Sequence, residues 1–215
     1  MSATEPHPWL AGALVPGRFG AAAGEPVRLG TRACELVQVL ARRDGDAALQ
    51  AAIRAAGGPD LPPPGHAAQG ERMAALWTQP RGWLIQAGPD AGLARRLADA
   101  CGPAAAVVEQ THGRCVFTLE GAHARAVLAR LCRVDLHPRA FGPGRVAATP
   151  RSEIAAVIHQ TGAAPGFDII VASSYARAVA GMLAAAAAPI GYQVGGDQMG
   201  GDQMGGDQMG GDRVD

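Results

Sequence analysis

The segment Val107–Gly144, VVEQTHGRCVFTLEGAHARAVLARLCRVDLHPRAFGPG, contains the signals of every type of element expected in this chain. It predicts a strand, a tight turn, a second strand, a helix, and a loop with two prolines and two glycines. In the second strand Cys115, Phe117 and Leu119 occupy alternate positions, a period of two that is typical of a sheet with one face on the core. The segment contains no evident nucleophile or set of metal ligands. We therefore expect it to be an architectural element more than a catalytic one.

The rest of the chain repeats this pattern of short strands and amphipathic helices. Strands are predicted over residues 35–41, 71–77, 83–87, 105–110, 114–119, 145–149, 153–160 and 167–172. Helices are predicted to begin at Asp46 and Asp90, to cover residues 122–132, and to follow Ser173 or Ser174, the last with Tyr175, Val179, Met182 and Leu183 on one face. Most strands are joined by connections too short for parallel crossovers. The expected fold is therefore α+β, with mostly antiparallel sheets and two halves that echo each other.

The amino-acid composition divides the chain into three regions. Residues 1–30 are rich in proline and glycine and predict an extended arm, which carries apolar side chains such as Trp9 and Phe19 and should lie on its own domain or on a partner. Residues 31–190 form the α+β domain. Residues 191–215 contain the unit Gly-Gly-Asp-Gln-Met three times in succession from Gly195, which cannot bury a core and predicts a disordered tail. A calcium-binding β-helix is the alternative for this tail, but such helices use a nine-residue period.

Charge and termini exclude several classes of protein. The chain has 19 basic and 19 acidic residues, and all the basic ones are arginine. The tail from Gly195 holds five aspartates and one arginine, so the body carries 18 arginines against 14 acids, dispersed along the chain. Nucleic-acid-binding proteins usually cluster their positive charge, so no nucleic acid is expected as a partner. The first residues, MSATEPHPWLAG, do not resemble a signal peptide, and no apolar run is long enough to span a membrane, so we expect a cytoplasmic protein.

Catalytic patterns are scarce. The four cysteines form no CxxC pair and are expected to be free structural thiols, and no two of the six histidines have metal-ligand spacing, so no metal site is predicted. Asp135 and His137 have two interpretations. They form an acid/base pair if they converge on a cleft, or else Asp135 caps a turn while His137 bonds to the backbone; we favour the second. Trp77 and Trp83 are interpreted as core residues or interface anchors, with core preferred.

Four stretches of the sequence resemble stretches that follow one another in the same order in the sequences of a known family. They are Leu76-Trp77 with Pro80 and Trp83-Leu84-Ile85, then residues 107–114, then Leu119–Leu128, then the loop Asp135–Gly144, and the closing Phe167–Tyr175 fits as well. Over roughly residues 8–190 the chain resembles the gamma subunit family of heterotetrameric sarcosine oxidases, within the glycine-cleavage T-protein superfamily. The most specific part is the DLHP loop that ends in Phe-Gly-Pro-Gly. One departure is Glu109-Gln110-Thr111, where the family often has Asp-Val/Leu-Ser.

The resemblance implies a fold of two intertwined α+β subdomains, like the folate-binding region of the T-proteins. It also implies a role as a non-catalytic gamma subunit packed against alpha, in a complex with alpha, beta and delta subunits. That complex oxidatively demethylates sarcosine to glycine, produces hydrogen peroxide and passes the one-carbon unit to tetrahydrofolate. The family places FAD, FMN and NAD in the alpha and beta subunits, zinc in delta and folate in alpha. No cofactor or metal is then expected on this chain.

A second hypothesis is a standalone folate-binding or one-carbon transfer protein of the T-protein type. It requires a pocket with a carboxylate that grips the pterin ring and a cation that holds the glutamate tail. Glu109 and Asp135 are the candidate carboxylates of the central stretch, and Arg114 or Arg139 the candidate cations. This hypothesis therefore needs one of these carboxylates and one of these cations at the same pocket.

Overall fold

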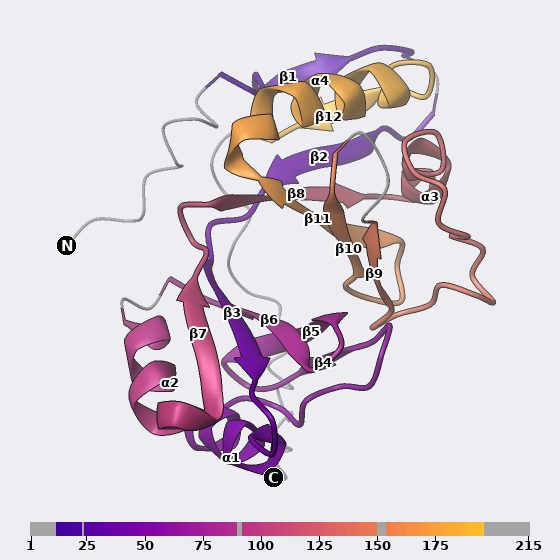
Figure 1. Cartoon of the computed structure of the whole chain (residues 1–215). Coiled ribbons are helices and arrows are strands. Elements are labelled where there is room, and N and C mark those ends of the chain that lie inside the picture. Colours follow the sequence, from indigo (N-terminus) through magenta and orange to yellow (C-terminus); the bar gives the residue numbers. More distant parts are fainter. Residues whose placement is uncertain (1–11, 23, 90–91, 150–153, 196–215) are drawn as a thin grey trace, which may run out of the picture.

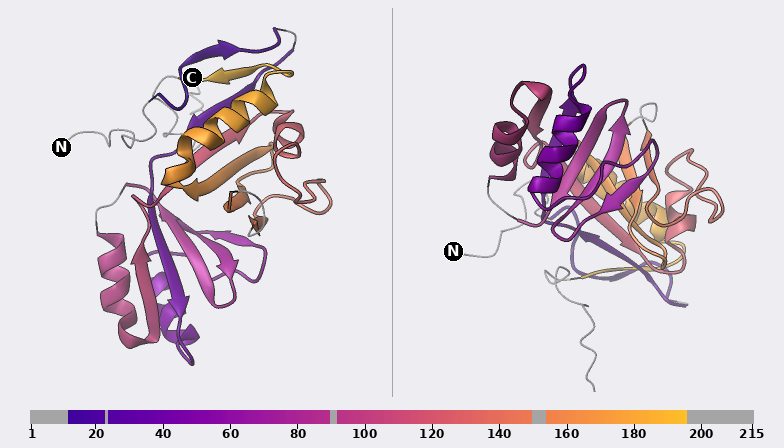
Figure 2. Two further views of the ribbon diagram at one scale, coloured as in Figure 1. Left: turned by 45° about the horizontal axis from the view of Figure 1, so that its top comes forward. Right: turned by 90° about the horizontal axis from the view of Figure 1, so that it is seen from below.

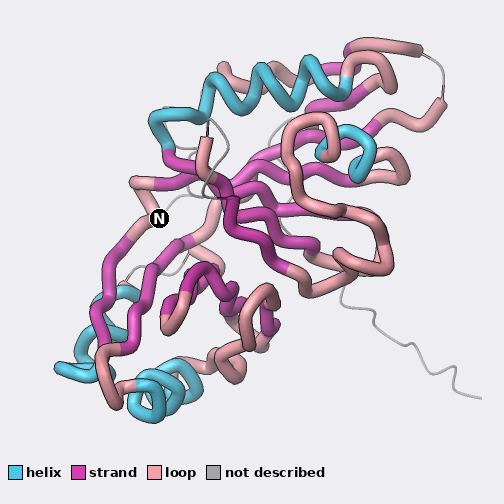
Figure 3. Tube along the Cα trace, turned by 45° about the vertical axis from the view of Figure 1, so that its right-hand side comes forward, coloured by secondary structure: helices cyan, strands magenta, loops and turns pink. Residues whose placement is uncertain are grey.

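A computed structural model describes residues 12–22, 24–89, 92–149 and 154–195 of the chain. Two β-sheets form the centre of the molecule, and helices lie on their outer sides (Figure 1). The helices at the two ends of the molecule are separated by the strands, as the tube coloured by secondary structure makes clear (Figure 3). The structure therefore confirms the expected α+β class with two largely antiparallel sheets.

The larger sheet has seven strands in the order β1-β12-β2-β8-β11-β10-β9. All of its pairings are antiparallel except that of β12 with β2, which is parallel. Its strands are β1 (Gly17–Phe19), β2 (Val27–Thr31), β8 (Arg114–Glu120), β9 (Val146–Thr149), β10 (Ala156–Gln160), β11 (Gly166–Ala172) and β12 (Tyr192–Val194).

The smaller sheet has five strands, all antiparallel, in the order β4-β5-β6-β3-β7. Its strands are β3 (Glu35–Ala41), β4 (Ala67–Gln69), β5 (Met73–Gln79), β6 (Gly82–Ala87) and β7 (Ala105–Glu109). The helices are α1 (Asp46–Ala55), α2 (Leu93–Cys101), α3 (Ala124–Leu128) and α4 (Ala176–Ala187), with short 3-10 turns η1 (Gly102–Ala104) and η2 (Ser173–Tyr175). Sequence patterning missed only the short strands β1, β2, β4 and β12.

Three apolar clusters hold these layers together. One lies between the seven-stranded sheet and helices α3 and α4, and includes Phe117 and Phe167. A second lies between the five-stranded sheet and helices α1 and α2, and includes Ile85. The third lies between the two sheets and joins residues such as Leu84 of β6 to Ile170 of β11. Each sheet therefore has both faces covered, which Figure 2 shows from two further directions.

The side chains of strand β8 contribute to two of these apolar clusters, one on each face of the sheet. Cys115, Phe117 and Leu119 face the helix side, as the alternation predicted, and all are buried. Val116 faces the other sheet, and Thr118 beside it is also buried. A strand that is covered on both faces needs apolar side chains at nearly every position, and β8 has them.

The predicted hairpin in the central segment is wrong. Residues 105–109 pair with β3 in the five-stranded sheet, whereas residues 114–120 pair with β2 and β11 in the seven-stranded sheet. The turn between them is a crossover from one sheet to the other. Local signals indicate where a strand begins and ends, but they do not specify the strand with which it pairs.

This crossover makes the two halves intertwined. The chain starts in the seven-stranded sheet, builds the whole five-stranded sheet with residues 35–109, and returns to the first sheet. The two sheets are also joined at one edge, where Ala67 N–H donates to the Gly144 carbonyl at 2.7 Å and Val146 N–H to the Gly65 carbonyl at 2.9 Å. Between these bonds Arg145 Nη1 lies 2.7 Å from His66 Nε2.

The described part of the N-terminal segment is packed on its own domain. Residues 27–31 form an inner strand whose Val27 and Leu29 are buried, so this part of the segment is a strand of the sheet rather than an extended arm, and of the two expected locations it has the one on its own domain. Gly20 and Gly191 allow this packing, because a Cβ at Gly20 would lie 2.3 Å from the Ala188 carbonyl oxygen and one at Gly191 would lie 2.2 Å from that of Ala21. Both glycines also have positive φ.

The other end of the domain extends past the predicted boundary at residue 190. Residues 192–194 form β12, an inner strand of the seven-stranded sheet, so the low-complexity tail cannot begin at residue 191. Residues 196–215, which hold most of the repeat, lie outside the described residues, as do residues 1–11.

Two helices differ from their predictions. Helix α3 covers only Ala124–Leu128 of the predicted 122–132, because the N–H groups of Arg130 and Leu131 donate to carbonyls three residues earlier and tighten the turn. Of the four residues predicted to share one face of the closing helix, Tyr175 and Met182 are 45% and 39% exposed, so that face is only partly buried. The buried face is made by Val179, Leu183 and alanines. Ser173 does not cap the helix, because its Oγ donates to the His112 carbonyl at 2.9 Å.

Candidate functional site

A buried ionic contact joins the two sheets at their centre. Asp168 of β11 is 2% exposed and accepts a hydrogen bond from Arg32 Nη2 at 3.1 Å and another from Gln86 Nε2 at 3.0 Å. Arg32 lies in the linker between β2 and β3, and Gln86 lies on β6 of the opposite sheet. The carboxylate therefore ties together both sheets and the linker between them. Charge-assisted bonds of this kind are the strongest available to a buried carboxylate.

The groups around Asp168 have shifted acid–base properties. Burial raises the pKa of the Cys34 thiol to about 12, and the Asp168 charge adds to this shift. Burial lowers the pKa of His159, which lies opposite Asp168 in the β10–β11 register. Burial also works against the charge of Arg32, but the Asp168 charge and hydrogen bond outweigh it and raise the pKa of the guanidinium. At neutral pH the cluster therefore holds a protonated thiol, a neutral imidazole and one ion pair.

This buried cluster is suited to holding the sheets together rather than to nucleophilic chemistry. A thiol whose pKa is near 12 is not a nucleophile at neutral pH, because the thiolate is the reactive form. Two buried atoms of the cluster, Arg32 Nε and His159 Nδ1, have no hydrogen-bond partner among the described residues. In the carboxylate each oxygen accepts one hydrogen bond, Oδ1 from Arg32 and Oδ2 from Gln86.

A second polar centre is Arg125 of α3, around which the loop Asp135–Gly144 folds. Its Nη1 donates to the backbone carbonyls of Leu136 and Phe141, the latter at 2.9 Å, and its Nη2 donates to Gln160 Oε1 at 2.7 Å. The guanidinium also lies 5.4 Å from the centroid of the Phe167 ring, a cation–π contact. The stretch that best resembles the known family is therefore a loop held from inside by one arginine.

At the tip of this loop, Asp135 and His137 make the backbone contacts that are expected if their role is structural. Asp135 Oδ1 accepts the N–H of His137 at 2.9 Å, which is an Asx turn. His137 Nδ1 accepts the N–H of Arg139 at 3.2 Å. Both side chains are exposed and both are engaged with backbone, so the acid/base interpretation has no support in the geometry.

The four residues of the folate hypothesis lie in two separate parts of the molecule, Glu109 and Arg114 around the turn between β7 and β8 and Asp135 and Arg139 on the loop after α3. Glu109 ends β7 in the five-stranded sheet, whereas Arg114 begins β8 in the other sheet, and Arg114 Nε donates to Gln110 Oε1 at 3.4 Å rather than to Glu109. Asp135 and Arg139 lie on the loop after α3, on the opposite side of the molecule from β7 in both views (Figures 1 and 2). None of these four residues is in the lining of the two cavities on the five-stranded half of the molecule.

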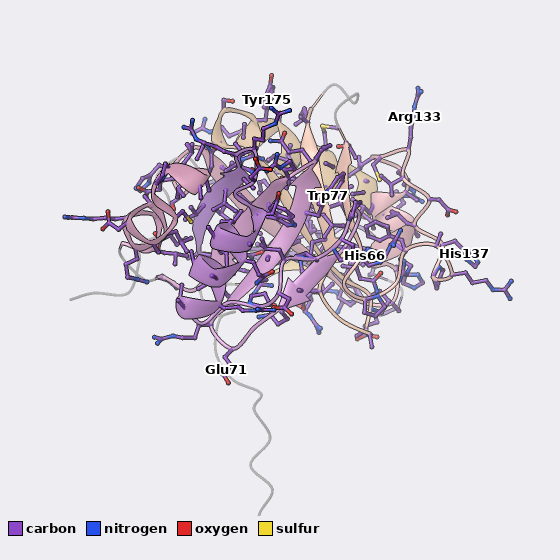
Figure 4. The ribbon with its side chains drawn as sticks, turned by 60° about the horizontal axis from the view of Figure 1, so that its bottom comes forward. His66, Glu71, Trp77, Arg133, His137 and Tyr175 are labelled. Atoms are coloured by element: carbon purple, nitrogen blue, oxygen red, sulfur yellow. The ribbon has the colours of Figure 1, made fainter. Side chains whose placement is uncertain are left out.

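Two open cavities lie on the five-stranded half. One, of about 620 Å³, lies between α1 and α2, and half of its lining residues are alanines, with Arg72 and Arg96 among the others. The other, of about 670 Å³, is a shallow groove beside Trp77 and Trp83. The two tryptophans face each other across β5 and β6, both are half-buried, and Trp83 Nε1 donates to the Pro62 carbonyl at 2.9 Å. They are therefore partly core and partly surface (Figure 4 labels Trp77).

The described part of the chain has neither a cluster of metal ligands nor a helix that could span a membrane. There, no three His, Cys, Asp or Glu side chains gather in a way that would hold a metal ion. No described helix is long and apolar enough to cross a bilayer. The four cysteines are all free, as expected, and burial raises the pKa of each thiol.

Sequence reasoning missed the residues that organise both polar centres. The sequence did contain a signal for Asp168, because a carboxylate inside the apolar run Phe167–Val171 needs a buried partner. It contained no signal that this partner is Arg32, since nothing in the sequence relates two residues 136 positions apart. Nothing in the local sequence indicates that Arg125 bonds to the loop that follows its helix, because that contact forms only when the loop folds back.

The two sheets, the helices that cover them and the two polar centres define an α+β domain with two intertwined halves. The glycine cleavage system aminomethyltransferase T from Bartonella henselae has the same fold, with a TM-score of 0.53 and 17% identity over 74% of this chain and 45% of that one. At this identity the likeness shows the fold alone. More specifically, the chain belongs to the sarcosine oxidase gamma subunit family, whose model matches residues 42–189.

Individual relatives agree with this assignment. A sarcosine oxidase gamma subunit from Arthrobacter is 38% identical over 128 residues, which cover 58% of this chain and 63% of the relative. One from Corynebacterium strain U-96 is 36% identical over 52% of this chain and 56% of its own length. The chain thus matches less than two thirds of the length of these relatives. A chain of the heterotetrameric sarcosine oxidase from Corynebacterium U-96 matches in structure, with a TM-score of 0.69 and 30% identity over 78% of this chain and 86% of that one.

Proposed function

We propose that this chain is the gamma subunit of a heterotetrameric sarcosine oxidase and serves there as a structural component. In the proposed complex it packs against the alpha subunit, with beta and delta subunits completing the assembly. The chain supplies a shaped surface rather than a catalytic group. This proposal combines the family assignment with the arrangement of the polar side chains.

The observation that carries the proposal is the structural match to a chain of the Corynebacterium heterotetrameric enzyme. The match covers 86% of that chain, so nearly the whole domain is shared rather than a common motif. At 30% identity, as opposed to the 17% of the aminomethyltransferase, the likeness reaches the level of the particular family.

The interior of the domain supports a structural role. Asp168 is occupied by Arg32 and Gln86, and Arg125 is occupied by backbone carbonyls and Gln160. A catalytic group needs a free reactive atom that faces a space where a substrate fits. These polar groups are instead directed at other parts of the same chain.

The proposed reaction belongs to the complex as a whole. It is the oxidative demethylation of sarcosine to glycine, with reduction of oxygen to hydrogen peroxide and transfer of the one-carbon unit to tetrahydrofolate. FAD, FMN, NAD, folate and zinc are assigned to the other subunits in this proposal. The chain is then a cytoplasmic protein that works only as part of its assembly.

Co-expression provides the test. The full chain is produced alone and together with the alpha, beta and delta subunits, and each preparation is analysed by size exclusion and for sarcosine-dependent oxygen uptake. We expect the chain to elute with the other subunits and the activity to require their presence. Titration of the isolated chain with tetrahydrofolate, followed calorimetrically, should give no heat of binding.

Two results would contradict the proposal. A chain that remains separate from the other subunits under all conditions would not be a subunit of that enzyme. A soluble monomer that binds tetrahydrofolate at micromolar concentration would favour the standalone folate hypothesis, and variants of Glu109, Arg114, Asp135 and Arg139 would then be the first to examine.

A further inference from the structure

The loop that follows α3 is fixed from inside before any partner arrives. Arg125 holds the carbonyls of Leu136 and Phe141, and both of these side chains are buried, at 5% and 4% exposed. Phe141 stacks on Phe167 with centroids 6.5 Å apart. At the start of the loop Arg130 Nη1 donates to the Ala186 carbonyl at the end of α4, at 2.7 Å.

The outer side of the same loop is basic. Arg133, His137 and Arg139 are exposed, and neither the Arg133 nor the Arg139 guanidinium makes a hydrogen bond or an ion pair with another described residue. Residues 129–144 contain three arginines and one aspartate, a net charge of +2. Figure 4 shows that Arg133 and His137 point away from the body of the protein and away from each other. We call Arg133, His137 and Arg139 the basic tip.

The different directions in which these side chains point indicate the kind of partner that the basic tip fits. A single phosphate or carboxylate is bound by donors that converge on one point, whereas the basic tip spreads its donors over a protruding surface. Arginine is enriched in protein interfaces, where its planar guanidinium pairs with carboxylates. A rigid loop also loses little conformational entropy when it binds. A broad acidic protein surface is thus the best match in both charge and shape.

We infer that the basic tip docks onto an acidic patch of the large alpha subunit and steers the association of the two chains. This inference rests on the proposed function and adds the surface through which the chain recognises its partner. Complementary charges of this kind raise the association rate and set the orientation of the partners, and salt weakens both effects.

The test compares two double charge reversals in the full chain. R133E/R139E reverses the basic tip, and R42E/R43E makes the same change in charge at the end of β3, where both arginines are also exposed. Each variant is co-expressed with the alpha subunit, and its affinity is measured by surface plasmon resonance at 50 mM and 300 mM salt. Neither change removes a described side-chain contact, so both variants should show the circular dichroism of the wild type.

We expect R133E/R139E to weaken binding by about 10-fold or more at low salt, mostly through a slower association rate, and the difference to shrink at high salt. R42E/R43E should bind like the wild type. Equal binding by R133E/R139E and wild type, or equal weakening by both variants, would overturn the inference while leaving the proposed function intact. Failure of the wild-type chain itself to bind alpha would refute the proposed function instead. Retention of the wild type on DNA that R133E/R139E abolishes, with unchanged binding to alpha, would assign the basic tip to nucleic acid and also overturn the inference.

Discussion

Removal of the Arg32 guanidinium is the most direct test of the contact between the sheets. In Arg32→Met the aliphatic stem remains, but the Asp168 carboxylate, whose side chain is 3% exposed, keeps only the Gln86 donor. A buried charge then lacks its counter-charge. Arg28→Met is the matched control, because Arg28 lies in the preceding strand and its pair with Glu120, at 3.5 Å, has side chains 54% and 35% exposed.

The magnitude follows from burial. Removing one partner of a fully buried ion pair destabilises a protein by about 3–5 kcal/mol. The Arg32 side chain is 37% exposed, so water screens the pair and we expect a cost of about 2–3 kcal/mol. For a chain of this size that corresponds to a fall in melting temperature of about 4–12 °C. The control, Arg28→Met, should cost about 0.5 kcal/mol or less, as surface pairs do.

A double-mutant cycle completes the experiment. Asp168→Asn keeps an oxygen that accepts from Gln86 but removes the charge, so the variant R32M/D168N contains no buried unpaired ion. We expect the double variant to be more stable than Arg32→Met alone, with unfolding in urea followed by circular dichroism. Strictly additive effects of the two substitutions, or a cost for Arg32→Met no larger than for Arg28→Met, would refute the argument that the ion pair holds the sheets together.

Three further predictions concern Arg125, His159 and Cys34. Arg125→Met leaves buried carbonyls of loop 129–144 without a donor, so the chain should lose about 2–4 kcal/mol of stability, and the amides of that loop should exchange hydrogen faster while those of β3 do not. The pKa of His159 is lowered in the folded state, so its contribution to stability is complete above the unfolded pKa of about 6.5 and is lost as pH falls below it. Unfolding in urea between pH 5 and 8 should show this loss, and His159→Gln should flatten the profile; an unchanged slope would contradict the assignment. Since the pKa of Cys34 is raised to about 12, Ellman's reagent should label this thiol at pH 8 only when urea unfolds the chain.

The sequence determined most of the local structure. Alternation in Cys115–Leu119 identified a strand and its core-facing side. Strand β3 was placed at residues 35–41, the range that the structure has. These features depend on backbone geometry and on the periodic placement of apolar side chains, both of which are encoded within a few neighbouring residues. The resemblance to the gamma subunit family likewise followed from short runs of letters.

Strand pairing and the polar centres were decided only by the tertiary structure. The segment Val107–Gly144 appeared continuous, yet its first two strands belong to different sheets because β7 finds its partner in β3 and β8 finds its partners in β2 and β11. The same long-range packing placed Arg32 beside Asp168, and it folded the loop Asp135–Gly144 around Arg125. A hydrogen bond or an ion pair depends on distance in space, and the sequence specifies that distance only through the complete set of packing contacts that forms when both sheets assemble.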